Sequence, residues 1–547
     1  MSNSLRDDLL NLRRFLVKAL ALLPITITPL MVSNYSYDYF NIPKWDFYFF
    51  CFFLLGSLLL FTKKIYIPKI PNLDALCFLS IFAVTTLISI FLASGQWSHI
   101  LLYRISFIIY VFIFFQLFKS EKINLITLTH ALQGTSLFLI LLGVVFHISQ
   151  ESSLNLASAQ LISATLGNSN LFAEFLGLTL LVSIYSHTKS HSKVTLLGWG
   201  IVSAIAIYLA ILQCRSVNLF VILGLLWSTF SFSGKNRIKT TLISLILCIS
   251  FVYKFKKSPL PTGHVNSVSD IKLQKQNQKA MGSIEARWAI AMASLDHIYH
   301  HPLGVGSNQF EFSILPYLAK RGVRLPQKSL WFTPHNEFLK LLIEEGILVT
   351  TGLMVLLIGM LIFIWKRIEK PDQTLFEILT LFFLGEALFQ FPLESAHTVL
   401  LMAVSLSYFL GLLEATEVKN HSLWPYPLGI ALVIIWGTSI YSHLQTNGKN
   451  RDTAKLAKAC HIYPENWRAC THLSYVLISQ KKYIKASEIL TPLLESTPFN
   501  TIALRNISLA KLNAGEKKSA CMYMSRYQKL FLQNDMTKLF KKNCTAL

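Results

Sequence analysis

The chain has 547 residues, of which 53% are hydrophobic, 13% aromatic and only 14% charged. A soluble protein of this length carries about 25% charged residues, so the composition excludes a soluble enzyme and indicates a protein that crosses a membrane several times. The formal net charge of +22 reflects the basic inner loops described below, and we do not interpret it as nucleic-acid binding.

Apolar runs of roughly 17 to 25 residues recur along the chain, and each is long enough to cross a hydrocarbon layer of about 30 Å. The predicted fold class is therefore all-α, a polytopic helical membrane protein. About thirteen spans are expected, near residues 15–33, 46–62, 75–94, 98–118, 124–148, 171–187, 195–213, 216–233, 239–254, 337–366, 374–391, 394–413 and 425–442.

The distribution of lysine and arginine predicts the orientation of these spans, because both residues favour cytoplasmic loops. If the N-terminus is inside, the inner loops contain Lys63 and Lys64, Lys119 and Lys122, Lys189 and Lys193, Lys235 with Arg237 and Lys239, and Lys366 with Arg367 and Lys370. The outer loops are short and mostly neutral, apart from a large loop over residues 255–336. An odd number of spans then leaves the C-terminal part of the chain outside, facing a periplasm.

Three charged residues lie at or just inside the outer ends of spans. Arg104 either snorkels to the nearby interface or belongs to an anion site. The run GNSNLFAEF contains Asn170, in a turn that caps a helix, and Glu174, an acid inside a span that is expected to face a partner or an aqueous site. Arg215 occupies the very short joint ILQCRSVNLF, where the charge rule disfavours an arginine. We therefore expect it to bind an anion or, alternatively, to anchor a turn.

The large outer loop holds the remaining candidates. IEARWAIAMASLDHIYHHP has helical spacing, with Arg287 near its start, and Arg321 and Arg324 follow. In WFTPHNEFLKLLIEEGILVTTG, His335 and Asn336 fall at the first turn of a helix that continues into a span. They form either a capping pair or part of a catalytic site. Glu394 and His397, at the outer mouth of a later span, either satisfy a helical turn or line the site.

Residues 446–547 are polar and helical, which divides the chain into a membrane domain, 1–445, and a C-terminal domain, 446–547. Pro464 and Pro498 are 34 residues apart, the tetratricopeptide period, so a small helical module is expected outside. Its cysteines pair most simply as Cys460 with Cys470 and Cys521 with Cys544, although connectivity does not follow from sequence.

An outer site with several arginines suits a diphosphate, because guanidinium groups pair with phosphate oxygens at any accessible pH. A nearby histidine can take a proton from a hydroxyl acceptor. The expected reaction is glycosyl transfer from a membrane-held polyprenyl diphosphate. We expect no metal site, since CxxC and HExxH patterns are absent, and no cofactor, since P-loop and Rossmann glycine patterns are absent.

The segment TPHNEFLKLLIEEGILVTTGL resembles the HNxxLxxxxExG signature of the O-antigen ligase and polymerase (Wzy_C) superfamily. The similarity extends to GNSNLFAEFLGL, LQCRS, EARWAIAMASLDHIYHHPLGVGSNQF and FPLESAHTVLLMAVSLSYFLGLLE, so it covers roughly residues 165–415. The ending of this region and the outer helical module look most like the PglL-type bacterial protein O-oligosaccharyltransferases. Position 214 is cysteine where the family usually has serine.

The resemblance implies a GT-C-like fold in a bacterial inner membrane and an undecaprenyl-diphosphate-linked glycan as donor. His335 would activate the acceptor, Arg215 and Arg287 would bind the diphosphate, with Arg104, Arg321 and Arg324 as further candidates, and Asn336 and Glu345 would orient the helix. Asn170 and Glu394 would support the site. The acceptor would be a pilin-like periplasmic protein or, alternatively, lipid A core or a growing polymer.

Two other classes of function remain open at this point. A transporter of the lipid-linked glycan would also need many spans and cationic residues, but it should place charges near the bilayer midplane and show repeated spans. A non-catalytic anchor for the helical module leaves Arg215, Arg287 and His335 without a role.

Overall fold

The computed structural model describes most of the chain. It covers residues 3–32, 41–60, 64–92, 97–150, 164–166, 168–189, 196–212, 214–231, 234–257, 283–306, 309–321, 323, 334–390, 392–419, 426–446, 452–462, 466–530, 539 and 543–544. Arg324 lies outside the described residues, as does the stretch 258–282 of the predicted outer loop.

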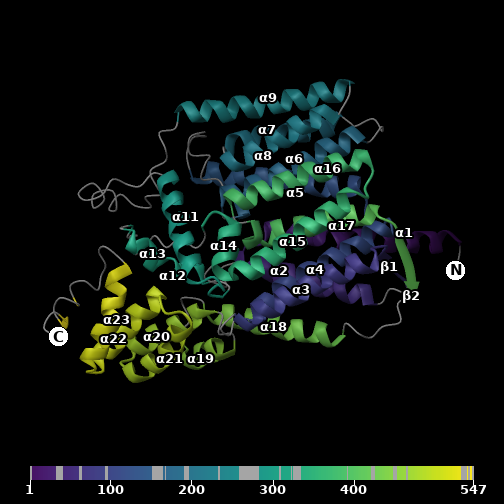
Figure 1. Cartoon of the computed structure of the whole chain (residues 1–547). Helices are drawn as coiled ribbons and strands as arrows, with labels where there is room; N and C mark the ends of the chain where they lie inside the picture. The colour runs from purple at the N-terminus through teal and green to yellow at the C-terminus, as the bar shows by residue number, and fades with distance from the viewer. Residues whose placement is uncertain are drawn as a thin grey trace.

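Each predicted span coincides with a helix (Figure 1). These helices are α1 (Asn3–Ile27), α2 (Asn41–Leu60), α3 (Asn72–Leu92), α4 (Trp97–Lys119), α5 (Leu125–Gln150), α6 (Ser169–Lys189), α7 (Leu196–Leu212), α8 (Arg215–Ser231), α9 (Gly234–Lys257), α15 (Gly346–Trp365), α16 (Lys370–Phe389), α17 (Ala396–Leu412) and α18 (Tyr426–Gln445). Among the described residues, four stretches are both long and apolar enough to cross a membrane: Leu102–Lys119, Leu125–Val145, Ser169–Lys189 and Gly346–Trp365. The chain is thus an all-α polytopic membrane protein.

The predicted span 337–366 is wrong in one respect, because it is two helices rather than one. One residue, Glu345, separates α14 (Glu337–Glu344) from α15, and Gly346 at the junction has a φ of 80°. This left-handed backbone conformation breaks the helix and lets the following residues leave in a new direction.

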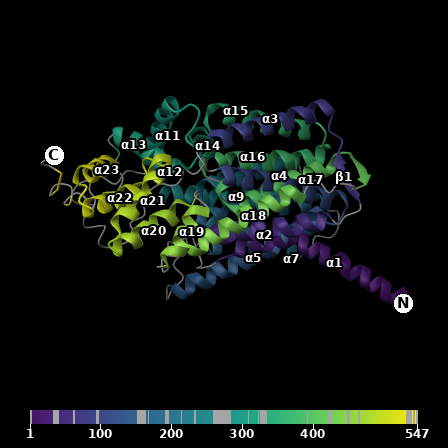
Figure 2. The same ribbon diagram turned by 90° about the horizontal axis from the view of Figure 1, so that it is seen from below.

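The two ends of the bundle differ in structure (Figures 1 and 2). At one end, β1 (Lys64–Pro68) pairs antiparallel with β2 (Ala415–Lys419), which the sequence analysis did not predict. The Gln116 side chain hydrogen-bonds both the N–H and the C=O of Tyr66, at 2.7 Å each, and so satisfies the backbone of β1. At the other end lie α11 (Ser283–His300), α12 (Phe310–Ser313), α13 (Leu315–Lys320), α14 and the C-terminal helices.

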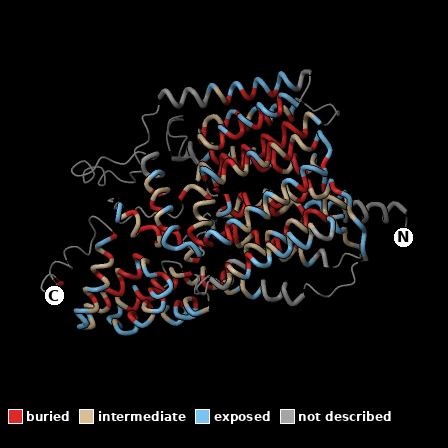
Figure 3. The backbone as a smooth tube through the Cα atoms, in the orientation of Figure 1, coloured by how far each residue is buried: buried red, intermediate tan, exposed pale blue. Residues whose placement is uncertain are grey.

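The bundle core is built around α6, which is buried along most of its length (Figure 3). α6 packs against α5, α7, α8 and α16. At Gly177 three helices approach closely, since a Cβ there would stand 2.9 Å from Val217 Cγ1 and 3.2 Å from Phe382 Cε2. One turn outward from this contact, α6 and α16 carry the two buried acids Glu174 and Glu386.

The C-terminal module contains a repeated helical hairpin. α20 (Trp467–Ser479) and α21 (Tyr483–Ser496) have the same lengths as α22 (Thr501–Asn513) and α23 (Lys517–Leu530), and each bound recurs 34 residues later. α19 (Thr453–Ile462) precedes them. The predicted disulfides Cys460–Cys470 and Cys521–Cys544 are both present.

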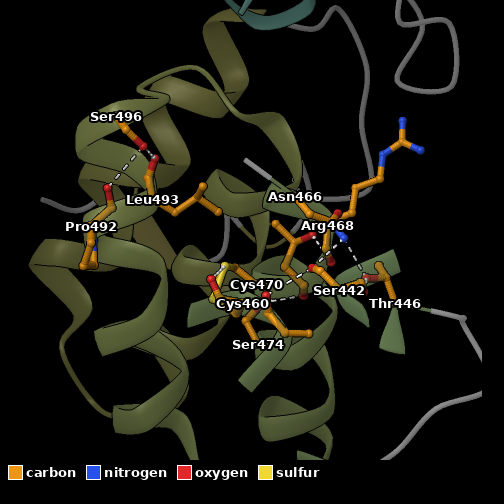
Figure 4. Close-up of a disulfide and its surroundings, with 12 residues drawn as sticks. Ser442, Thr446, Cys460, Asn466, Arg468, Cys470, Ser474, Pro492, Leu493 and Ser496 are labelled. Carbon is orange, nitrogen blue, oxygen red and sulfur yellow. Dashed lines mark hydrogen bonds between the residues drawn. A yellow bond between two sulfur atoms is a disulfide. The ribbon is translucent and has the colours of Figure 1, made fainter. Parts of the chain in front are cut away.

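The module is fixed to the last span by a buried polar contact near the first disulfide (Figure 4). The Asn466 side chain donates hydrogen bonds to Ser442 Oγ at 3.1 Å and Thr446 Oγ1 at 2.9 Å. Ser442 in turn donates to the carbonyl of Ala459 at 3.1 Å. The end of α18 and the start of α20 are therefore held together by side chains and not only by the connecting chain.

A single apolar core joins the module to the outer helices of the membrane part. It includes Ile290 of α11, Leu315 of α13, Ile343 of α14 and, from the module, Leu490, Leu504 and Tyr527. The rings of Phe312 and Trp467 meet edge to face, with centroids 5.1 Å apart. Because this core includes α11 and α14, the module supports the two helices that border the candidate site.

Candidate functional site

The candidate site depends on a close backbone contact between the turn after α11 and the junction of α14 with α15. Gly306 N donates to Glu344 O at 2.8 Å, and Ile347 N donates to Pro302 O at 2.8 Å. Gly304 and Gly346 face each other with φ values of 82° and 80°. A Cβ on Gly346 would stand 2.3 Å from the carbonyl carbon of Leu303. Only glycine fits both positions, and the contact fixes α11 against α14.

His335 lies immediately before α14 in an unusual backbone conformation. Its φ of 52° is in the left-handed region, which a residue with a side chain rarely adopts. The next residue, Asn336, is the N-cap of α14 and accepts a hydrogen bond from Leu339 N at 2.9 Å. The capping interpretation is thus correct for Asn336. For His335 the strained backbone is maintained by the surrounding structure, a feature that often accompanies functional sites.

The structure brings His335, Arg287 and Arg215 together from three distant parts of the sequence. Arg215 is the first residue of α8, Arg287 lies in the first turns of α11, and α11 packs against α14. Arg287 is close enough to both Arg215 and His335 for its charge to act on them. The N-terminus of α8 adds a positive helix-dipole end to the two guanidinium groups.

The electrostatics of the three residues favour an anion. Burial lowers the pKa of Arg287, interaction with Cys214 opposes this, and the charge of Arg215 lowers it further. An arginine remains protonated even so, so two like charges are held side by side. Burial first, and the charge of Arg287 second, lower the pKa of His335 to about 4. Its imidazole is therefore neutral at pH 7 and able to accept a proton.

Arg104 and Glu345 form an ion pair beside this site. Arg104 Nη2 lies 3.0 Å from Glu345 Oε2, and their side chains are only 15% and 8% exposed. Glu345 is the residue between α14 and α15. Arg104 has a partner within the protein, so we leave it out of the diphosphate ligands and assign the pair to holding α4 against the α14–α15 junction.

Of the other two predicted arginines, the structure describes only Arg321, which is ion-paired. Arg321 Nε is 2.8 Å from Asp296 Oδ2, an ion pair between the end of α13 and α11, with both side chains about one third exposed. Arg324 lies outside the described residues, and so does the side chain of Glu394 in the 3₁₀ turn Pro392–Glu394. We therefore build the site without these three.

Asn170 belongs to a chain of hydrogen bonds that runs beneath Arg215. Asn170 Nδ2 donates to Gln390 Oε1 at 3.2 Å, Gln390 Nε2 donates to Ser216 Oγ at 3.0 Å, and Ser216 donates to Glu386 Oε2 at 3.4 Å. Glu386 and Gln390 are 1% and 3% exposed. The chain fixes the first turn of α8 to α16 and α6.

Several of these residues were not singled out in the sequence analysis. Ser216 and Gln390 gave no signal, because single polar residues at span ends are common. Gly304 and Gly346 were visible in LGVG and EEG, but their opposition depends on contacts between residues more than forty positions apart. Among the described residues, no group of three or more His, Cys, Asp and Glu side chains could hold a metal ion.

Comparison with known proteins gives one family match. Residues 200–354 match the family model described as Wzy_C, O-Antigen ligase, whereas a search of curated proteins found no match. The matched residues include Arg215, Arg287 and His335, and the remaining helices complete an all-α membrane bundle. Residues 200–354 of this membrane protein therefore match a Wzy_C (O-antigen ligase) domain, which supports a membrane glycan-transferring ligase in general.

Proposed function

We propose that this protein transfers a glycan from undecaprenyl diphosphate to a hydroxyl acceptor at the outer face of a bacterial inner membrane. The observation that carries the proposal is the cluster of Arg215 and Arg287 beside a neutral, half-buried His335. Two guanidinium groups and a helix N-terminus suit a diphosphate. The imidazole is the base required at the acceptor.

In the proposed reaction the acceptor oxygen attacks the anomeric carbon of the first sugar. The bond from that carbon to the diphosphate oxygen breaks, and its electron pair leaves with the diphosphate. The proton of the acceptor hydroxyl passes to the His335 imidazole. Arg215 and Arg287 stabilise the charge that develops on the leaving group, which is the largest electrostatic change in the reaction.

Binding of the donor would also improve the base. The charge of Arg287 contributes to the low pKa of His335. A bound diphosphate would offset that positive charge, so the pKa of His335 would rise toward its ordinary value once the donor is in place. The base would then be strongest only in the donor complex.

Two features support an outer location for this chemistry. The basic loops predict that the N-terminus and the β1–β2 pair face the cytoplasm, and the candidate site lies at the opposite end of the bundle (Figure 1). The two disulfides of the module require an oxidising compartment.

A periplasmic helical module favours a protein acceptor, such as a pilin-like protein, over lipid A core or a growing polymer.

The test uses purified protein in detergent, an undecaprenyl-diphosphate glycan and two acceptors, a pilin-like protein and core lipopolysaccharide. We expect transfer to the protein, reduced about 10²- to 10⁴-fold in His335→Ala and at least as strongly in Arg287→Ala. Matched controls are His130→Ala and Arg237→Ala, since both side chains are exposed near the predicted inner end of the bundle. Both controls should retain wild-type transfer.

Other outcomes separate the alternatives. If glycan is transferred only to core lipopolysaccharide, the acceptor is lipid A core and not a protein, and the proposed reaction is unchanged. Transfer unaffected by His335→Ala and Arg287→Ala, or movement of the lipid-linked glycan across vesicles without transfer, would overturn the proposal in favour of transport.

A further inference from the structure

Two acidic side chains are buried inside the bundle directly below the arginine-bearing turn of α8. Glu174 of α6 is 2% exposed and Glu386 of α16 is 1% exposed. They lie one turn outward of the Gly177 contact that joins α6, α8 and α16. An acid inside a membrane bundle is costly unless it is neutralised or has a function.

Within the part of the chain that the structure describes, only one of the two carboxyl oxygens of each acid accepts a hydrogen bond. Thr398 donates to Glu174 Oε2 at 3.3 Å, and Ser216 donates to Glu386 Oε2 at 3.4 Å. Glu174 Oε1 and Glu386 Oε1 are both buried without a hydrogen-bond partner among the described residues. A third buried acceptor, Asn218 Oδ1, is also without a partner one turn into α8. These buried acceptor oxygens have no donor in the described part of the chain, which indicates a place where a proton or another positive species can bind.

The two carboxyl groups are close enough to interact with each other, and Cys214 interacts with both. Cys214 also interacts with Arg287. Electrostatic interactions therefore connect the acid pair with Cys214 at the start of α8, Cys214 with Arg287, and Arg287 with His335. His397 of α17 precedes the Thr398 that donates to Glu174, and it is hydrogen-bonded to Ser395 and interacts with Lys44 of α2.

Two buried carboxyl groups that interact in a low-dielectric site cannot both ionise easily, so together they retain a proton. We propose that Glu174 and Glu386 form a proton-binding pair whose protonation is coupled to the binding of a diphosphate at Arg215 and Arg287. This inference rests on the proposed function, because it takes the diphosphate as the anion bound there. A diphosphate raises the cost of negative charge below it, so the pair takes up a proton as the diphosphate binds.

The coupling has a measurable sign. As the pH rises and the pair loses its proton, diphosphate binding weakens, by up to about tenfold per pH unit for one coupled proton. Gln replaces Glu with a neutral side chain that still accepts the hydrogen bonds of Ser216 and Thr398. Glu174→Gln and Glu386→Gln should therefore flatten the pH dependence without removing binding.

The experiment is calorimetric titration of the full-length protein in detergent with geranylgeranyl diphosphate, a short polyprenyl diphosphate. Titrations at pH 6.5, 7.5 and 8.5, in buffers of different ionisation enthalpy, give both the affinity and the protons taken up. Proton exchange by the ligand itself is common to all variants and cancels in their difference. We expect wild type to take up more protons than either variant, and the double variant to have a nearly constant affinity.

The matched control is Glu377→Gln, which makes the same change on α16 at its other end. Glu377 is half-buried and accepts hydrogen bonds from Trp227 and Trp365, both at 2.8 Å, so its replacement should leave the pH dependence of binding as in wild type. Melting curves of each variant show whether it is folded, and Glu174→Gln alone keeps the test available if Glu386→Gln does not fold.

Each remaining outcome has a definite meaning. If the diphosphate binds wild type and both variants with equal proton uptake, the coupling is wrong and the proposed function stands. If binding depends on Na⁺ at constant pH, compared with choline, the pair binds a metal cation and the proton proposal is overturned. If the diphosphate does not bind wild type at all, the proposed function fails and the coupling with it.

Discussion

Gly346 shows how one residue without a side chain can define this site. Its φ of 80° and its contact with the backbone of Leu303 both require glycine. Gly346→Ala should therefore add a steric clash to backbone strain, each worth about 1–3 kcal/mol, and reduce both the melting temperature and transfer. The measurement is a thermal melt in detergent alongside the transfer assay.

Gly515 offers a matched control for the strain alone. It has a φ of 86°, but a Cβ there would meet nothing within 4 Å. Gly515→Ala should lower the free energy of unfolding by the cost of backbone strain alone, which is less than the loss in Gly346→Ala. It should not change transfer by the folded protein. If Gly346→Ala and Gly515→Ala lower the melting temperature equally, the tight contact between the α11 turn and the α14–α15 junction is contradicted.

The protonation of His335 gives a second prediction at the residue scale. Its pKa is lowered to about 4 by burial and by Arg287, so the imidazole is neutral above that pH and becomes charged as the pH falls through it. Labelling by diethyl pyrocarbonate, which reacts with the neutral form, should lose half its rate near pH 4 when followed by mass spectrometry of the His335 peptide.

Arg287→Gln should move that midpoint upward, because it removes the neighbouring positive charge. The shift should stop short of the ordinary value near 6.5, since burial is the larger cause and remains. A midpoint that stays the same in Arg287→Gln would show that the two side chains are not close.

At the scale of elements, the ion pair between Arg104 and Glu345 links α4 to the junction of α14 and α15. Removing one partner leaves a charge in a poorly hydrated place and should cost about 3–5 kcal/mol. Arg104→Met and Glu345→Gln should therefore each lower the melting temperature, while the double variant should be more stable than the sum of the single losses implies. Additive losses in this double-mutant cycle would contradict the pairing.

The elements differ in how far sequence alone could predict them. Spans follow from apolar runs of bilayer length, and all the predicted runs coincide with helices. The break at Glu345 and Gly346 could not be predicted from its own segment alone, because Gly346 is held there by contact with the backbone of Leu303. The strands Lys64–Pro68 and Ala415–Lys419 are short and lie some 350 residues apart, so no local pattern indicated their pairing.

At the scale of the whole molecule, the C-terminal module shares its apolar core with α11 and α14. Trp467→Ala should loosen α11 and thereby weaken diphosphate binding as well as acceptor use. Tyr475→Ala is a suitable control, because this aromatic residue on the same helix is 52% exposed. Donor binding measured with geranylgeranyl diphosphate distinguishes the two roles. If Trp467→Ala in the folded protein impairs only acceptor use, the module acts in acceptor recognition alone.

Sequence alone could predict those site residues whose type is unusual for their position in the chain. Arg215 in a tight outer joint and His335 before a span both stood out in the sequence. Arg104 and Arg321 stood out for the same reason, but their partners Glu345 and Asp296 are supplied by folding and could not be recognised beforehand. Burial and charge proximity, which lower the pKa of His335, likewise exist only in the folded chain.

The most direct test of the central claim separates binding from catalysis in one pair of variants. Diphosphate affinity and glycan transfer are measured together for wild type, His335→Gln and Arg287→Gln. The account predicts that His335→Gln binds geranylgeranyl diphosphate like wild type but transfers no glycan, whereas Arg287→Gln loses affinity as well as transfer. Full transfer by folded His335→Gln, or unchanged affinity in Arg287→Gln, would contradict it.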